Sequence, residues 1–299
     1  MAAKDRPVAN VFIEQQLDAG LGKIGDALDA NVITFCGALT YGSDLQIRDA
    51  VEAIKPRKRR IGFIIDSPGG YIVVAERIAH LLRAKYRNVD FIVPDSAMSA
   101  ATVLVMCGDR IFMDYFSVLG PIDPQAERAD GSFVPALGYL HQYERLIEKS
   151  RAGTLTTAEM TFLVQRFDPT ELYAYEQAKN LSISLLKEWL VKYKFKNWKR
   201  TQTRRLRVTK KMRESRADAI ATELTNTKTW KSHARGIPMD VLRRRLNLKI
   251  EDFGEEPKLA EPIRSYYDLL QDYMGKMSHA GVVHTLERYT PLTWRRRHG

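Results

Sequence analysis

Cysteine is nearly absent from this 299-residue chain, and long hydrophobic runs are absent altogether. The two cysteines, Cys36 and Cys107, lie in separate apolar runs. This usage excludes a disulfide framework and a structural zinc site, and favours a reducing cytoplasm. No stretch of eighteen apolar residues occurs, so we expect no membrane-spanning helix, and the first residues lack the apolar core of a secretory signal. Neither a cluster of metal ligands nor a nucleotide-binding fingerprint is present, so we expect no metal and no cofactor.

The positive charge of the chain is concentrated in one segment. In total, 47 basic and 36 acidic residues give a net charge of +11. Residues 187–216 hold 13 basic and two acidic side chains, which leaves the rest of the chain neutral. We therefore expect a basic helical insertion, and a solvated or subunit-contacting arm is favoured over nucleic-acid binding. Nucleic acid stays an alternative because the stretch from Lys192 to Arg207 interleaves aromatics with cations, a composition used for stacking on bases.

Strand and helix signals alternate through the first 125 residues. Short apolar runs predict buried strands, and apolar residues at helical spacing predict helices between them. This alternation predicts an α/β fold of βαβ units with a mainly parallel sheet. Beyond residue 125 the patterns are helical. The predicted strands are 32–36, 61–65, 91–93 and 110–113, and the predicted helices are 11–28, 44–54, 71–83, 99–107, 140–147, 171–198, 241–248 and 263–274.

Two turns from a strand into a helix are candidate sites, because ligands bind beyond the carboxyl ends of parallel strands. The first turn reads Asp66-Ser67-Pro68-Gly69-Gly70. Paired glycines let backbone N–H groups approach a ligand at a helix start, which suits an oxyanion or a phosphate. The alternative is a tight turn without a function.

The second turn runs from Pro94 to Thr102 and places Ser99 at a helix start among alanines. A serine in that place is either a helix N-cap or a nucleophile. Taken together, the two turns supply a candidate nucleophile and candidate donors for the charge that develops on a carbonyl oxygen.

Four separated motifs resemble the serine dehydrogenase proteinase family, which is distantly related to the Clp protease proteolytic subunit and to signal peptide peptidases. The similar stretches are 64–70, 94–102, 111–114 and 119–125, followed by a late segment that contains Trp230 and His233. The resemblance implies the Clp/crotonase fold, a repeated βαβ spiral with a helical C-terminal part. It implies a proteinase domain over residues 30–275 with the basic insertion at 187–216, a helical segment at 1–29 and a basic tail at 276–299.

The resemblance also implies a catalytic triad in the chain order Ser, Asp, His. Ser99 is then the nucleophile, His233 the general base and Asp123 the orienting carboxylate. The second choice for the carboxylate is Asp114, and His141 competes as the base. The oxyanion hole is expected from the backbone N–H groups of Gly69, Gly70 and Ala100.

Three functions are compatible with these residues. The favoured one is a cytoplasmic serine peptidase that cuts peptide or protein substrates through an acyl-enzyme, and the resemblance implies a homo-oligomer. The first alternative is a crotonase-type acyl-CoA enzyme with a carboxylate base in place of Ser99. The second is a catalytically inactive scaffold that binds nucleic acid.

Overall fold

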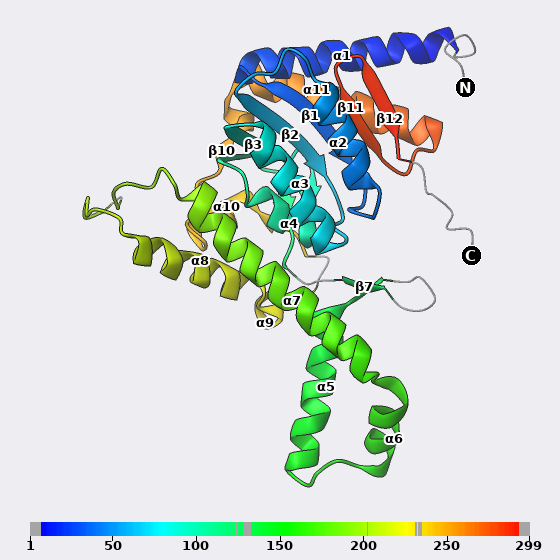
Figure 1. Ribbon diagram of the computed structural model, residues 1–299, viewed down its shortest axis with the longest axis vertical. Coiled ribbons are helices and arrows are strands. Elements are labelled where there is room, and N and C mark those ends of the chain that lie inside the picture. Colours follow the sequence, from blue (N-terminus) through cyan, green and yellow to red (C-terminus); the bar gives the residue numbers. More distant parts are fainter. Residues whose placement is uncertain are drawn as a thin grey trace.

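The core of the computed structural model is one large sheet that is parallel over most of its width. The structure describes residues 7–122, 125–127, 133–201, 203–230, 232 and 235–292. The sheet has the order β10 (Glu251–Asp252), β5 (Arg110–Met113), β3 (Asn88–Ile92), β2 (Arg60–Asp66), β1 (Asn31–Cys36), β11 (Val282–Thr285) and β12 (Arg288–Pro291). The strands from β10 to β1 run parallel, and β11 and β12 add an antiparallel hairpin at one edge (Figure 1). The expected α/β class with a mainly parallel sheet is confirmed.

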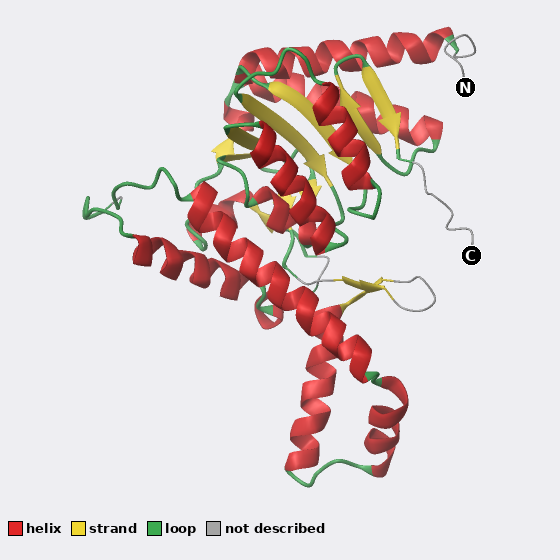
Figure 2. Ribbon diagram, viewed as in Figure 1, coloured by secondary structure: helices red, strands yellow, loops and turns green. Residues whose placement is uncertain are grey.

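Helices cover both faces of this sheet (Figure 2). Because the parallel strands are buried on both faces, their sequences are mostly apolar, and alternate residues join different cores. Ile33 and Phe35 of β1 pack into the core on one face, and Val32 and Cys36 into the core on the other. The first face carries α2 (Ser43–Ala53), α3 (Ile72–Lys85) and α4 (Ala100–Val105), and the second carries α1 (Val8–Leu28) and α11 (Pro257–Met277).

Further helices extend the first face and form an arm. Trp189, at the end of α7, is 1% exposed in the first core. The N-terminal part of α7 continues outward with α5 and α6 as an arm that projects from the body (Figure 1). The remaining elements are β7 (Gln125–Glu127), β8 (Phe133–Pro135), α5 (Ala136–Arg151), α6 (Thr157–Arg166), α7 (Pro169–Trp189), the π-helical turn η2 (Leu190–Lys194), α8 (Lys210–Leu224), α9 (Thr227–Trp230), α10 (Met239–Arg244) and the 3-10 turn η3 (Phe253–Glu255).

The C-terminal end of the chain differs from the sequence-based expectation, whereas the helix expected near the N-terminus is present as α1. Residues 276–299 were expected as a tail, yet β11 pairs with β1 and its Val282 and Val283 are buried. The helical segment expected at 1–29 is part of the core as well, because Leu17 and Ile24 of α1 are fully buried against α11 and the sheet. Within the described residues, none of the helices is long and apolar enough to cross a bilayer.

Candidate active site

The two turns singled out in the sequence meet at the carboxyl edge of the parallel strands. The first follows β2, and the second follows β3, contains β4 (Ser96–Ala97) and leads into α4. Backbone hydrogen bonds join them: the Ser67 N–H donates to the Ser96 oxygen at 2.9 Å, and the Met98 N–H donates to the Ser67 oxygen at 2.9 Å. Two segments 30 residues apart in the chain are therefore held in a fixed register.

Gly69 lies directly against Ser99. A Cβ atom built on Gly69 would come within 2.9 Å of the Ser99 Cβ and 3.4 Å of the Ala100 nitrogen. The φ of Gly69 is +98°, a conformation that favours glycine. The absence of a side chain at residue 69 therefore lets the first turn pack directly against the serine.

Ser99 itself adopts a backbone conformation that is rare for a residue with a side chain. Its φ is 51° and its ψ is −118°, and its side chain makes no capping hydrogen bond to α4. The N-cap explanation for this serine therefore fails. Its side chain is 1% exposed. Residues held in sparsely populated conformations cluster at functional sites, because the surrounding structure has to maintain them against about 1–3 kcal/mol of strain.

Two of the three predicted oxyanion-hole donors face no acceptor among the described residues. The Gly69 N–H donates to the Ser67 hydroxyl oxygen at 3.2 Å, so this donor is engaged inside its own turn. Leu39 bonds the residues on either side of Gly70, through its N–H to the Gly69 oxygen at 2.8 Å and its oxygen to the Tyr71 N–H at 2.9 Å. The N–H of Gly70 is thereby turned away from Leu39. It and the Ala100 N–H are the donors that stay available within the described part of the chain.

Three short strands converge on this site. β4 pairs with β6 (Val118–Leu119), and β6 pairs with β9 (Ile237–Pro238). Ala97, Leu119 and Ile237 lie side by side in this small sheet. Asp123 and His233, the other predicted triad residues, lie outside the described residues, but each is four positions from this row along the chain.

Thr102 fastens the chain that leads toward residue 123 to the first turn of α4. Its hydroxyl donates to the Ala97 oxygen at 2.6 Å and lies 3.0 Å from both the N–H and the oxygen of Gly120. Two residues further on, the Ile122 N–H donates to the Leu224 oxygen at 2.9 Å, which ties the same segment to the end of α8. Thr102 was not singled out in the sequence, because a threonine in an apolar helix carries no signal of its role.

The two alternative site residues have other surroundings. Asp114 is buried, and its carboxylate accepts hydrogen bonds from Ser117 and, at 2.9 Å, from the guanidinium of Arg264. His141 is exposed on α5 in the arm, with its Nδ1 3.8 Å from Glu144. These partners give Asp114 a role in closing the turn between β5 and β6.

A carboxylate next to the first turn ties the site to the other face of the sheet. Asp66 accepts hydrogen bonds from the Ser96 hydroxyl at 3.1 Å and from the Tyr267 hydroxyl and Gln271 of α11 at 2.8 and 3.2 Å. Burial, followed by the charge of Asp66, raises the pKa of nearby Asp95. Among the described residues, no group of three His, Cys, Asp or Glu side chains is placed to hold a metal ion.

Comparisons with known proteins identify a matching family. A family model described as ClpP-like SDH-type serine proteinase matches residues 32–203 of the chain. Two uncharacterized proteins of Methanocaldococcus jannaschii are similar to it. One is 39% identical over 87 residues, which cover 29% of this chain and 30% of the relative, and the other is 31% identical over 153 residues, which cover 50% of each. The chain thus spans half or less of the length of these curated relatives.

A solved structure also aligns with most of the chain. It is a mutant of a membrane-bound stomatin-specific protease in complex with a substrate peptide. The two share 15% sequence identity over 88% of this chain and 86% of that chain, with a TM-score of 0.45.

Proposed function

Because the chain belongs to the family of ClpP-like SDH-type serine proteinases, we propose that it hydrolyses peptide bonds with Ser99 as the nucleophile. The observation that carries this proposal is the strained backbone conformation of Ser99, which packs against Gly69. Two backbone N–H groups nearby, those of Gly70 and Ala100, have no hydrogen-bond acceptor among the described residues. The family match includes both turns and Asp123, and it ends before His233.

In the proposed mechanism, His233 accepts the proton of the Ser99 hydroxyl while Oγ attacks the carbonyl carbon of the substrate. Asp123 orients the imidazole and stabilises its charged form. The protonated His233 then gives its proton to the leaving amine, and the C–N bond breaks to leave an acyl-enzyme. Water, deprotonated by the same imidazole, attacks the ester and releases the acid and the free serine.

The negative charge on the carbonyl oxygen is stabilised in this proposal by the N–H groups of Gly70 and Ala100. Removing a donor of this kind lowers the rate by about 10²–10³-fold in other enzymes, so fixed backbone donors are a large part of catalysis. The pairing of β4, β6 and β9 supports the triad, because neighbouring strands lie about 4.8 Å apart and four residues of extended chain span up to about 13 Å.

The test is covalent labelling with a fluorophosphonate, followed by peptide mapping and a hydrolysis assay. We expect the label on Ser99, and we expect Ser99→Ala to lose both the label and the activity. Ser182→Ala is the matched control, since Ser182 is equally buried in α7 but bonds only its own helix. His233→Ala and Asp123→Asn test the two other roles.

Three outcomes are decisive. If hydrolysis persists in Ser99→Ala, the assignment of Ser99 as the nucleophile is wrong. If His233→Ala keeps full activity while Ser99→Ala has none, the nucleophile stands and the base has to be sought elsewhere, at His141 first. Turnover of an acyl-CoA without labelling of Ser99 would instead support the crotonase-type alternative.

A further inference from the structure

The basic segment over residues 187–216 contains two groups of cations in the structure. One group is held by partners inside the molecule, in ion pairs or in hydrogen bonds to backbone oxygens. These side chains therefore stabilise the packing of the segment on the body. They are Lys187 on Asp218, Lys192 on Glu188, Lys196 on Asp109, Arg213 on the Trp198 oxygen and Arg216 on the Leu246 oxygen.

The second group lies on a hairpin between η2 and α8, which projects from the left of the body in Figure 1. Backbone bonds close it, from the Val208 N–H to the Lys199 oxygen and from the Thr201 N–H to the Leu206 oxygen, each at 3.0 Å. Residues 199–211 contain seven cations and no acidic residue. Five exposed cations without an acidic partner in the described part of the chain form what we call the basic hairpin: Lys199, Arg200, Arg204, Arg205 and Arg207.

A cavity of about 710 Å³ lies at the edge where β2 and β3 begin, and two of its lining residues, Lys196 and Asn197, lie just before the basic hairpin in the chain. Asp29 is its one acidic lining residue and lies 3.3 Å from Lys58. Arg59 and Arg87 are exposed there, and neither has an acidic partner within the described ranges. We call this cavity the basic pocket, after its five cations: Lys58, Arg59, Arg60, Arg87 and Lys196.

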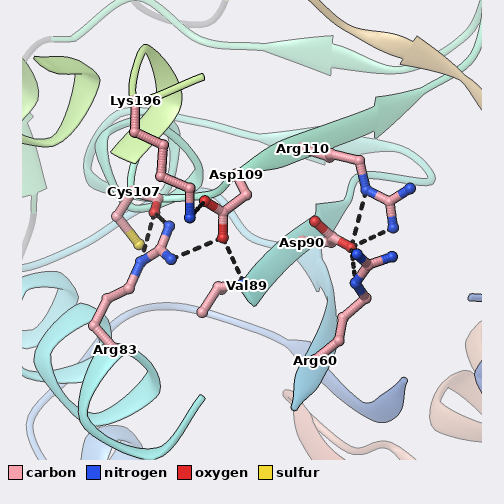
Figure 3. Close-up of polar contacts among 8 residues, drawn as sticks. All are labelled: Arg60, Arg83, Val89, Asp90, Cys107, Asp109, Arg110 and Lys196. Atoms are coloured by element: carbon pink, nitrogen blue, oxygen red, sulfur yellow. Dashed lines mark hydrogen bonds and ion pairs between the residues drawn. The ribbon is translucent and has the colours of Figure 1, made fainter. Parts of the chain in front are cut away.

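Two carboxylates hold part of the pocket in place. Asp90, which is 1% exposed, lies 3.5 Å from Arg60 and accepts a hydrogen bond from Arg110 at 2.6 Å. Asp109 pairs with Lys196 and with Arg83 (Figure 3). Burial acts to raise the pKa of Asp109, but hydrogen bonds from Lys196 and the backbone of residue 89 and the charge of Arg83 hold it below its usual value. Arg60 and Lys196 are therefore positioned before any ligand arrives.

The aromatics of the segment are not presented as a platform for bases. Phe195 is 8% exposed in the first core, and the Trp198 ring packs on it at 5.7 Å. Tyr193 is covered by the Arg83 guanidinium, 4.0 Å from the ring centre. The interleaved aromatics therefore anchor the segment, whereas the five cations of the basic hairpin are exposed.

We propose that the basic pocket and the basic hairpin together bind the phosphodiester backbone of a nucleic-acid duplex, without sequence selectivity. Guanidinium groups match phosphate oxygens with paired hydrogen bonds, and neighbouring phosphates of one strand recur about every 3.4 Å along the helix axis. The basic pocket and the basic hairpin are both positive, and neither presents an aromatic ring on which a base could stack. Together they fit a chain of repeated anions better than a single small anion.

This site is separate from the candidate active site. The basic pocket lies at the start of β2 and the Gly69 turn follows its end, and a seven-residue strand is about 20 Å long. The proposal therefore does not rest on the peptidase activity, and Ser99→Ala has to leave duplex binding unchanged.

The test is fluorescence anisotropy of a labelled duplex of mixed sequence, titrated between about 50 and 200 mM salt. Two paired variants remove equal charge from the two parts of the surface: Arg204→Gln with Arg207→Gln, and Arg59→Gln with Arg87→Gln. Each pair is expected to lower the affinity by about tenfold or more and to reduce the salt slope by about two. The matched control is Arg145→Gln with Arg151→Gln on α5, which removes the same charge from the arm.

The proposal is wrong if the duplex does not bind at the lowest salt, or if the control pair lowers the affinity as much as the other two. It is equally wrong if poly-glutamate competes as well as unlabelled duplex, because phosphate would then not be the recognised group. Tighter binding of a single strand than of the duplex would point to base stacking and would overturn the backbone assignment.

Discussion

At the scale of single residues, Ser99 is distinguished by its backbone conformation as well as by its hydroxyl group. Ser99 has a positive φ, and the two turns around it keep it in that conformation through the bonds between Ser67, Ser96 and Met98. Strain of this kind opposes folding, so the conformation of Ser99 reduces the stability of the protein.

A substitution to glycine measures that strain. We expect Ser99→Gly to be more stable than Ser99→Ala by about 1 kcal/mol, because glycine accepts a positive φ at little cost while alanine does not. Urea unfolding of the two variants measures the difference. Ser182→Gly, in the regular helix α7, is expected to show the opposite order relative to Ser182→Ala. A Ser99→Gly protein less stable than Ser99→Ala would show that the conformation is not strained.

The close approach of Gly69 to Ser99 makes a second prediction at this scale. Gly69 and Gly42 have nearly the same φ, +98° and +99°, but a Cβ on Gly69 would lie 2.7 Å from the Met98 oxygen, and one on Gly42 would meet nothing within 4 Å. Gly69→Ala is therefore expected to abolish fluorophosphonate labelling and hydrolysis, whereas Gly42→Ala retains both. Equal labelling rates in the two variants would contradict a site at this turn.

At the scale of elements, partly buried charged side chains connect helices to strands. Neither the local hydrophobic pattern nor the intrinsic propensity of these segments predicts such contacts. Asp109, just before β5, bonds the backbone of β3 at Val89, the end of α3 through Arg83 and the chain after η2 through Lys196. Four segments depend on this one carboxylate. The expected helix over 171–198 ends instead at Trp189, and the π-helical turn after it carries the chain toward this contact.

Removing this charge is expected to destabilise the fold in a pH-dependent way. Asp109→Asn leaves Arg83 and Lys196 without their charged partner, and losing hydrogen bonds between charged groups at this partly buried place is expected to lower the free energy of unfolding by about 1.5–3 kcal/mol. The pKa of Asp109 is lowered in the folded protein, so its contribution is complete above the usual carboxyl pKa of about 3.9. It disappears as the pH falls through the lowered value.

Urea unfolding at neutral and at acidic pH checks this. The difference between wild type and Asp109→Asn should shrink as the pH falls, and Asp268→Asn, at an exposed position of α11, should leave the stability unchanged at both pH values. A difference that grows in acid would show that the carboxylate does not stabilise the fold.

At the scale of the whole molecule, the hairpin of β11 and β12 forms one edge of the large sheet. His284 of β11 is fully buried, with Nδ1 2.8 Å from the Tyr266 hydroxyl and Nε2 3.1 Å from Asp18. The Tyr266 hydroxyl donates to Thr34 of β1 at 2.7 Å. This chain of polar groups joins α1, α11 and both ends of the sequence, on the face of the sheet opposite to α4.

His284→Leu tests this connection and serves as a control for the substitution of His233, the proposed base. We expect a loss of about 2–4 kcal/mol in the free energy of unfolding, because two buried polar partners lose their hydrogen bonds. Specific activity per folded molecule should stay at the wild-type value, since the network lies away from Ser99. Thermal unfolding together with active-site titration separates the two effects, and a stable but inactive variant would contradict this assignment.

The amino-acid sequence by itself determined the parallel core, because apolar strands alternating with helices over residues 32–113 leave few other folds. It also placed Ser99 and the paired glycines at strand ends, and so located the candidate site. Only the tertiary structure decided the conformation of Ser99, the engagement of Gly69 by Ser67, and which cations face outward. It alone revealed β11, which pairs with a strand about 250 positions earlier, and β12, which pairs with β11; each has four residues. Local patterns report burial and propensity, whereas contacts between distant segments depend on how the whole chain packs.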